Sequence, residues 1–236
     1  MSSNKVNQYQ IIEVSWEEKY LKGRTHPQSV RILTPGFVDE LKKLLYAEGD
    51  ESFHEFFDKI PEILERYPDP LIGELDYKRP LDFMDVYYNR PGMIACISER
   101  VKAILERQVI NRSEYLLKPI QLVNQPDMYY VLFIPMINIH NAGIDFKQSK
   151  YIYNKSDNKG DNLVIKNTED YLKHQDKYIP TKLVLKTNEL RSIYHIESCI
   201  HIFYSKAIVE SFLAERITGA SVVPEGQFCS LCIEHL

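Results

Sequence analysis

The sequence predicts an α+β protein with a mixed or mainly antiparallel sheet. After residue 83, short runs rich in β-branched and aromatic residues alternate with turn residues, which is typical of strands. Between residues 34 and 67, apolar residues recur three and four positions apart, which is the spacing of amphipathic helices. A pattern of strand, serine and helix then occurs twice, so strands and helices share one part of the chain.

Residues 1–82 are expected to form an N-terminal region that packs on the main domain. Apolar and polar residues alternate over residues 8–16 and 29–33, and this two-residue period predicts a strand in each. Two amphipathic helices follow. Residues 67–80 contain Pro68, Pro70 and Pro80 and are expected to form a connector without regular structure.

The two helices of this region carry start and stop signals. Thr34 fits an N-cap and Pro35 the first turn, where a missing N–H costs nothing, and Gly49 ends this helix. Ser52 and Glu55 form a capping box that opens the second helix.

The main domain is expected to span residues 83–236. Its expected strands are 85–88, 92–97, 115–123, 128–139, 150–153, 162–165, 182–186, 194–196 and 200–204, and the alternative for 128–139 is a strand broken at Pro135. The polar residues 154–161 predict an exposed hairpin loop, and Thr168 is expected to cap a short helical turn over 169–175.

The repeated pattern places Ser98 and Ser205 between a strand and a helix. A serine there is first of all an N-cap, because its oxygen accepts from an amide two or three residues on. Apolar residues follow at helical spacing: Val101, Ile104 and Leu105 in the first copy, and Ile208, Phe212 and Leu213 in the second. Two copies are too few for a solenoid and suit one domain built from two similar halves.

Composition and motifs argue against several classes of protein. No apolar run approaches the roughly 20 residues that cross a bilayer, and the polar N-terminus has no signal-peptide core. The four cysteines are expected to be free thiols, and the expected compartment is the cytoplasm. The sequence shows no phosphate-binding glycine loop, nucleophile elbow or zinc-protease motif, so we expect no catalysis and no cofactor.

The net charge of −4 conceals an acidic segment. Residues 36–85 carry 14 acidic and 6 basic side chains, which could steer a basic partner electrostatically. The partner-binding candidates are Glu55, Asp58, Glu62, Glu65 and Asp69. The alternative is that these residues form ordinary solvated helix faces.

The C-terminal residues Cys229, Cys232 and His235 could supply three zinc ligands, with a fourth from Cys199 or His201. The alternative is that the cysteines pack as small apolar residues in a terminal strand. The protein would then have no metal site.

A second candidate surface lies around the expected hairpin loop. Four lysines with two tyrosines between them could hold single-stranded nucleic acid: Lys147, Lys150, Lys155 and Lys159, with Tyr151 and Tyr153. Three aspartates dilute this charge and the chain is acidic overall, so a solvated hairpin is the alternative and no nucleic-acid partner is expected.

Several of these motifs, taken in order, resemble a family of bacterial immunity proteins encoded beside polymorphic contact-dependent toxins. The matching motifs are I-S-E-R-V-K-A-I-L-E at 97–106, Leu117-Lys-Pro119, Tyr129-Tyr-Val-Leu132, Ile144-Asp145 with Ser149, Ile202-Phe-Tyr-Ser205, Gly219 and Val223-Pro224. The likeness covers roughly residues 83–226. The chain departs from the family pattern at His140, where an acidic residue is usual, and at Lys206-Ala207, where Glu-Arg is frequent.

The resemblance implies inhibition by binding, with no catalytic residue. The implied partner is a cognate protein toxin, and an acidic surface would suit a basic one such as a nuclease. The alternative function is a small metal- or nucleic-acid-binding adaptor, built on the cysteine cluster or on the lysine-rich hairpin.

Overall fold

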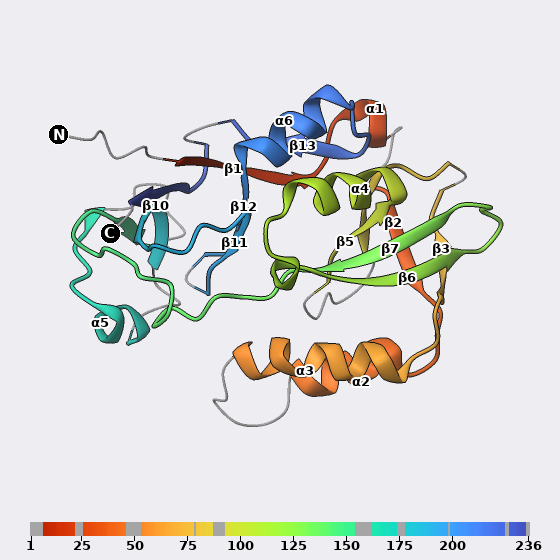
Figure 1. Ribbon diagram of the computed structural model, residues 1–236, viewed down its shortest axis with the longest axis horizontal. Coiled ribbons are helices and arrows are strands. Elements are labelled where there is room, and N and C mark those ends of the chain that lie inside the picture. Colours follow the sequence, from red (N-terminus) through yellow and green to blue (C-terminus); the bar gives the residue numbers. More distant parts are fainter. Residues whose placement is uncertain are drawn as a thin grey trace. The chain divides into compact units, whose positions relative to one another are not determined.

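The computed structural model describes residues 7–21, 26–45, 53–77, 79–86, 93–153, 162–173, 178–197, 199–224 and 227–234, and confirms an α+β fold (Figure 1). The chain forms two compact, interleaved units. The barrel unit comprises residues 13–136 and 210–221, and the sheet unit comprises residues 1–12, 137–209 and 222–236. No helix within the described ranges is long and apolar enough to cross a membrane.

The barrel unit is built on a closed barrel. Its strands follow one another around the wall in the order β2 (Ser29–Ile32), β3 (Leu71–Leu75), β6 (Leu116–Leu122), β7 (Met128–Phe133), β5 (Met93–Ser98) and β4 (Phe83–Val86). The pairs β2–β4 and β3–β6 are parallel, and the other pairs are antiparallel.

Helices α2 (Phe37–Leu45) and α3 (Phe53–Arg66) share the core of the barrel. They lie side by side as a hairpin in the lower part of Figure 1. Their buried apolar residues join inward-facing barrel residues in one cluster, which includes Phe37, Leu41, Phe56, Ile60, Ile63, Val30, Leu71, Cys96, Ile120 and Val131. Burial of apolar side chains at helical spacing therefore fixes this hairpin to the barrel.

Helix α4 (Glu99–Gln108) covers the outside of β5 and β7. It buries Val101, Ile104 and Leu105, as its sequence predicts, and β5 is consequently buried on both faces. The predicted cap is confirmed, because the Ser98 side chain accepts from the Val101 amide.

The sheet unit holds a second sheet. Its strand order is β11 (Ile193–His195), β12 (Ile202–Ser205), β1 (Asn7–Val14), β14 (Ser230–Glu234), β10 (Tyr178–Lys186), β8 (Lys150–Tyr153) and β9 (Asn162–Leu163), and β13 (Ala220–Val222) pairs with β1. β14 runs antiparallel to β1 and parallel to β10. The remaining elements are α1 (Glu18–Leu21), η1 (Arg112–Glu114), α5 (Thr168–Leu172) and α6 (Lys206–Ala214).

The division of the chain differs from the expected boundary between residues 82 and 83. That boundary falls inside the barrel unit, because β2 pairs with β4 and β3 pairs with β6. The expected connector of residues 67–80 in fact contains β3. The prolines lie outside this strand, so they do not interrupt its hydrogen bonds.

Three local expectations also need correction. β7 ends at Phe133 rather than residue 139, in line with the alternative of a break at Pro135, which has no amide to donate. Asn167, not Thr168, caps α5, since its side chain accepts from the Asp170 amide. Thr34 was expected to cap α2, but α2 begins three residues later, at Phe37. The Thr34 hydroxyl instead accepts from the Ile72 amide at 2.8 Å, which joins the segment before α2 to β3.

The two strand–serine–helix copies keep the expected element order but lie in different sheets. The first is β5–α4–β6 in the barrel, whereas β12 of the second belongs to the other sheet. In α6, Ile208 and Phe212 are buried as expected, but Leu213 is 62% exposed and Val209 is buried instead. A cap by Ser205 stays a prediction.

Candidate interaction surface

Only two of the predicted zinc ligands, Cys199 and Cys229, lie together in the described part of the chain. Burial alternates from Cys229 to Ile233, as the side chains of a strand alternate, so Cys229 is buried and Cys232 lies on the other face. Cys229 instead pairs with Cys199. The interaction between the two thiols, followed by burial, raises the pKa of Cys229, and the same interaction lowers the pKa of Cys199.

The other predicted ligands are also accounted for. The His201 ring stacks on Phe228 with 4.8 Å between centroids. His235 lies outside the described residues. Within the described ranges, no three His, Cys, Asp or Glu side chains gather in a way that could hold a metal ion.

The lysine-rich hairpin is only partly described. Lys147 and Lys150 are exposed, whereas Lys155 and Lys159 fall outside the described residues. Tyr151 is 1% exposed and belongs to the core of the sheet unit, so it cannot stack on a nucleobase. Tyr153 meets Tyr178 edge to face at 5.6 Å. The predicted aromatic platform is therefore in part a packed core.

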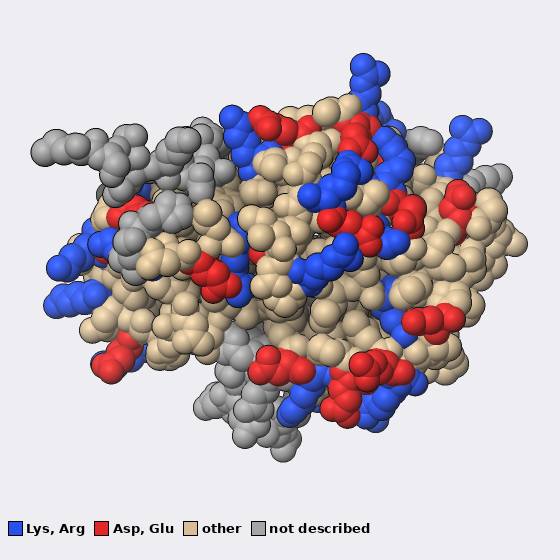
Figure 2. Space-filling view, in the orientation of Figure 1, with Lys and Arg blue, Asp and Glu red and all other residues tan. Residues whose placement is uncertain are grey.

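The predicted acidic surface lies on α3. Asp58, Glu62 and Glu65 are exposed there, and the side chain of Glu55 is not described. Arg66 pairs with Glu40 and lies 3.9 Å from Glu62. Figure 2 shows acidic and basic side chains beside one another in the lower part of the view, where α2 and α3 lie. This surface is therefore mixed rather than purely acidic.

Asp69 has a structural role that the sequence did not indicate. Its carboxylate lies 2.5 Å from Nζ of Lys118, whose side chain is 5% exposed. The same ammonium donates to the carbonyls of Leu64 and Tyr67 at 2.6 and 2.7 Å. Lys118 thus neutralises the C-terminal end of α3, and Asp69 supplies the compensating charge. A lysine in place of Asp69 would put a second positive charge beside the buried ammonium of Lys118.

An exposed apolar strip lies instead on the outer face of β2, β3 and β6. The antiparallel register pairs Arg31 with Glu74, which brings Leu33 beside Ile72, and the Leu33 amide donates to the Ile72 carbonyl at 2.8 Å. The parallel register of β3 and β6 places Gln121 beside Ile72, so Val123, whose amide donates to the Gly73 carbonyl at 2.8 Å, lies beside Glu74 and diagonally from Ile72. The side chains of Leu33, Ile72 and Val123 are 40%, 44% and 44% exposed. We call these three residues the apolar strip.

Alternation along β3 explains why the apolar strip points outward. Leu71 is fully buried and Ile72 is exposed, as successive strand residues face opposite sides. Gly73 faces the interior, where a Cβ would meet Ile120 Cδ1 at 2.6 Å. A glycine at this position therefore lets β6 side chains fill the barrel beside β3.

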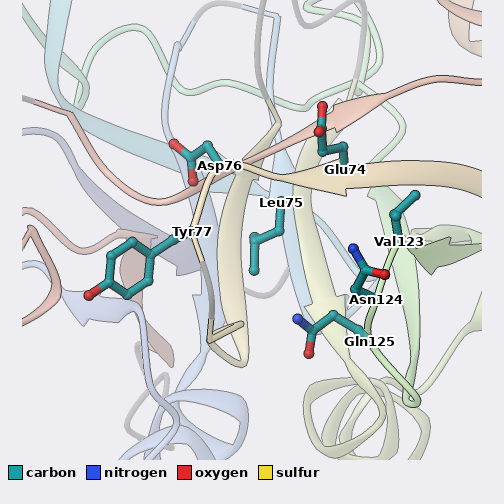
Figure 3. A pocket seen from close by; sticks show the side chains of 7 residues that line it. All are labelled: Glu74, Leu75, Asp76, Tyr77, Val123, Asn124 and Gln125. Atoms are coloured by element: carbon teal, nitrogen blue, oxygen red, sulfur yellow. The ribbon is translucent and has the colours of Figure 1, made fainter.

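A groove of about 780 Å³ adjoins the apolar strip at the ends of the parallel strands β3 and β6. It is lined by Glu74, Leu75, Asp76 and Tyr77 from β3 and its exit, and by Val123, Asn124 and Gln125 from the turn after β6. Figure 3 shows the Leu75 side chain near the middle of the view, with Asn124 and Gln125 on one side of it and Asp76 and Tyr77 on the other.

Hydrogen bonds hold both walls of the groove. Asp76 accepts from the Ser29 amide at 3.0 Å and from its hydroxyl at 3.1 Å, which fixes one carboxylate at the β3 exit. On the other wall, Gln121 Nε2 donates to the Gln125 carbonyl at 2.6 Å. Asn124 has φ 62°, the left-handed conformation that asparagine tolerates in turns. The groove is thus built before any partner arrives.

The carboxylates at the groove are engaged by residues of β2 and of the segment before it. The lining of the groove includes two carboxylates and two side-chain amides, and none of its described lining residues is a lysine or arginine. Arg31 pairs with Glu74 from the neighbouring strand and His26 Nε2 lies 3.5 Å from Asp76 Oδ2, so the carboxylates are partly compensated.

Sequence reasoning missed this surface because residues 67–80 were read as an irregular connector. The signal that could have found it is the alternation of Leu71, Gly73 and Leu75 with Ile72 and Glu74. No protein-family model matches the chain, and no curated protein matches its sequence, so the surface is defined by this structure alone.

Proposed function

We propose that this protein is a bacterial immunity protein that neutralises a cognate toxin by binding it, without catalysis. The observation that carries the proposal is the apolar strip beside the groove. Neighbouring exposed apolar side chains rimmed by polar groups are typical of surfaces that bind other proteins. The motif resemblance over residues 83–226 supplies the class of partner.

Inhibition of this kind needs a complementary surface that blocks the toxin, not a reactive group. Apolar residues at the centre of such a contact, here the neighbouring Leu33 and Ile72, contribute much of the affinity when they are removed from water. The exposed carboxylates of Asp58, Glu62 and Glu65 add an electrostatic contribution that would speed the encounter with a basic toxin. Binding would take place in the cytoplasm of the producing cell.

Titration calorimetry tests the proposal with purified protein and the C-terminal toxin domain encoded next to this chain's gene. We expect a one-to-one complex with a dissociation constant of about 10 nM or lower, in the range of specific interfaces of standard size. Co-expression should restore growth to cells that produce the toxin.

An unrelated toxin domain is the control and should neither bind nor be neutralised. Failure of the neighbouring toxin domain to bind at micromolar concentration, together with failure to protect cells, would refute the proposed function.

A further inference from the structure

We propose that Cys199 and Cys229 form a reversible disulfide when the protein meets a hydroperoxide, so that this pair is a site of oxidative modification. The inference goes beyond the proposed function, because it does not involve the candidate interaction surface. All four cysteines of the chain are free thiols in this structure, and the thiols of these two interact with each other.

Two segments of the sheet unit bring these thiols together. The Cys199 amide donates to the Ile196 carbonyl at 2.8 Å in a turn shortly before β12, and Cys229 directly precedes β14. The ring of His201 stacks on that of Phe228 with 4.8 Å between centroids, so the two segments lie side by side. Both cysteines belong to the same apolar cluster. Two thiols that already interact can form an S–S bond of about 2 Å with little movement of the backbone.

The pair contains one thiol that is suited to react first. A thiolate, not a thiol, attacks an oxidant, so a lower pKa favours reaction. The interaction with Cys229, together with a hydrogen bond from the His201 amide, lowers the pKa of Cys199. The Cys229 thiol donates to the Ser230 carbonyl at 3.6 Å, and the interaction with Cys199, followed by burial, raises its pKa. Cys199 is therefore the attacking residue, and Cys229 is the resolving one.

Position separates this pair from the other two cysteines. Cys199 and Cys229 are 6% and 7% exposed, which leaves them at the rim of the core and within reach of a molecule as small as hydrogen peroxide. Cys96 is fully buried in the barrel unit, and burial raises its pKa. Cys232 lies on the opposite face of β14 from Cys229, so it cannot replace Cys229 as the resolving thiol.

The reaction balances with a hydroperoxide as the oxidant. The Cys199 thiolate attacks a peroxide oxygen and the O–O bond breaks, which leaves a sulfenic acid on Cys199. The departing oxygen takes up the proton that Cys199 gave up. The Cys229 sulfur then attacks the sulfenic sulfur, the S–O bond breaks, and the hydroxide leaves as water with the proton of Cys229. Two electrons thus pass from two thiols to one peroxide, and hydrogen peroxide yields two molecules of water.

A thiol reductant reverses the bond by thiol–disulfide exchange. Such reversibility is typical of disulfides in reducing compartments, where they are transient and sense oxidants. The bond would join the segment before β12 to the segment before β14.

Peptide mapping of the full-length protein tests the inference. Trypsin cuts after lysine and arginine, so it releases Cys199 in residues 192–206, and both Cys229 and Cys232 in residues 217–236. The reduced, folded protein is treated with hydrogen peroxide, and its remaining thiols are then alkylated. We expect the two peptides to be joined within one chain, with two of the four thiols lost. Dithiothreitol should separate the peptides again.

Two serine variants identify the partner of Cys199. Cys232→Ser is the matched control, because it removes a thiol from the same peptide but should leave the link intact. Cys229→Ser should abolish the link and leave a sulfenic acid on Cys199, which dimedone labels in residues 192–206. Circular dichroism checks that both variants are folded. The maps of the unaltered protein and of Cys232→Ser leave the pair intact, so they decide the matter even where Cys229→Ser does not fold.

Three results would overturn the inference. The first is a map of the unaltered protein in which hydrogen peroxide leaves residues 192–206 unlinked. The second is a link that persists in Cys229→Ser and disappears in Cys232→Ser. The third is a dimedone label on Cys96 or Cys232 instead of Cys199 in the Cys229→Ser variant, which would contradict the order of attack. Toxin binding enters none of these measurements, so the proposed function stands or falls separately.

Discussion

Two sides of the same barrel wall differ in what covers them. On β5, Ile97 points outward and is fully buried, in the region that α4 covers. On β3, Ile72 also points outward but remains 44% exposed. On both strands successive side chains point to opposite faces of the barrel wall. The difference in exposure therefore comes from α4, which covers the outer face of β5, whereas Ile72 on the outer face of β3 stays exposed. The covered side should therefore determine stability, and the open side should determine binding.

The largest effect on the free energy of unfolding is expected where a substitution removes packing between α4 and the barrel. Ile104→Ala should lower the free energy of unfolding by about 3 kcal/mol, because it removes a fully buried side chain and leaves a cavity. Ile72→Ala, on the open side, should change it by less than about 0.5 kcal/mol. Urea unfolding measures both. Equal losses would show that the open side also belongs to the stabilising core.

An intermediate effect is expected at Asp82, which organises the covered side. Its carboxylate accepts from Ser98 Oγ at 2.8 Å, from Arg100 at 2.9 Å, and from the amide and hydroxyl of Thr218 at 3.0 and 2.8 Å. Asp82→Ala should cost about 2 kcal/mol, since several charge-assisted hydrogen bonds are lost. Glu74→Ala should cost less than about 1 kcal/mol, because its ion pair with Arg31 is exposed.

Thermal unfolding distinguishes these two carboxylates. A melting temperature that falls equally in both variants would contradict the assignment of stability to the covered side.

The smallest effect is expected at the cap of α4. Ser98→Ala should cost about 1 kcal/mol, the usual value of an N-cap. An aspartate often replaces a capping serine without loss, but here it would face the carboxylate of Asp82, which now receives a hydrogen bond from Ser98. Ser98→Asp should therefore be no more stable than Ser98→Ala at pH 7. Denaturant titration would disprove this if the aspartate variant matched the unaltered protein.

The sequence predicted what depends on neighbouring residues. The Ser98 cap, the buried positions of α4 and most strands follow from local spacing and propensity. The barrel, the interleaved units and the roles of Lys118 and Asp82 could not be predicted, because they depend on contacts between distant positions. Asp82 and Thr218 are 136 residues apart, and no local pattern marks either as a partner of the other.

The motifs that suggested an immunity protein include residues that hold the fold. The hydrogen bond from Lys186 lowers the pKa of Asp145 to about 2, and Ser149 Oγ accepts from the Val184 amide at 3.0 Å. Gly219 has φ 83°, and a Cβ there would meet the Phe83 carbonyl at 2.2 Å. Most of the candidate interaction surface lies outside the resembling residues 83–226. Motif likeness could therefore indicate a fold without indicating where a partner binds.

The return of residues 210–221 to the barrel unit has a consequence for synthesis of the protein. The ribosome makes every barrel strand before residue 134, yet Phe212 and Thr218 follow only after residues 137–209 of the sheet unit. Until then the ring of Phe212 cannot pack on Phe83, and the amide and hydroxyl of Thr218 cannot donate to the Asp82 carboxylate. The last contacts of the barrel can therefore form only after residues 137–209 of the sheet unit have been made, although domains usually fold in the order in which they are made.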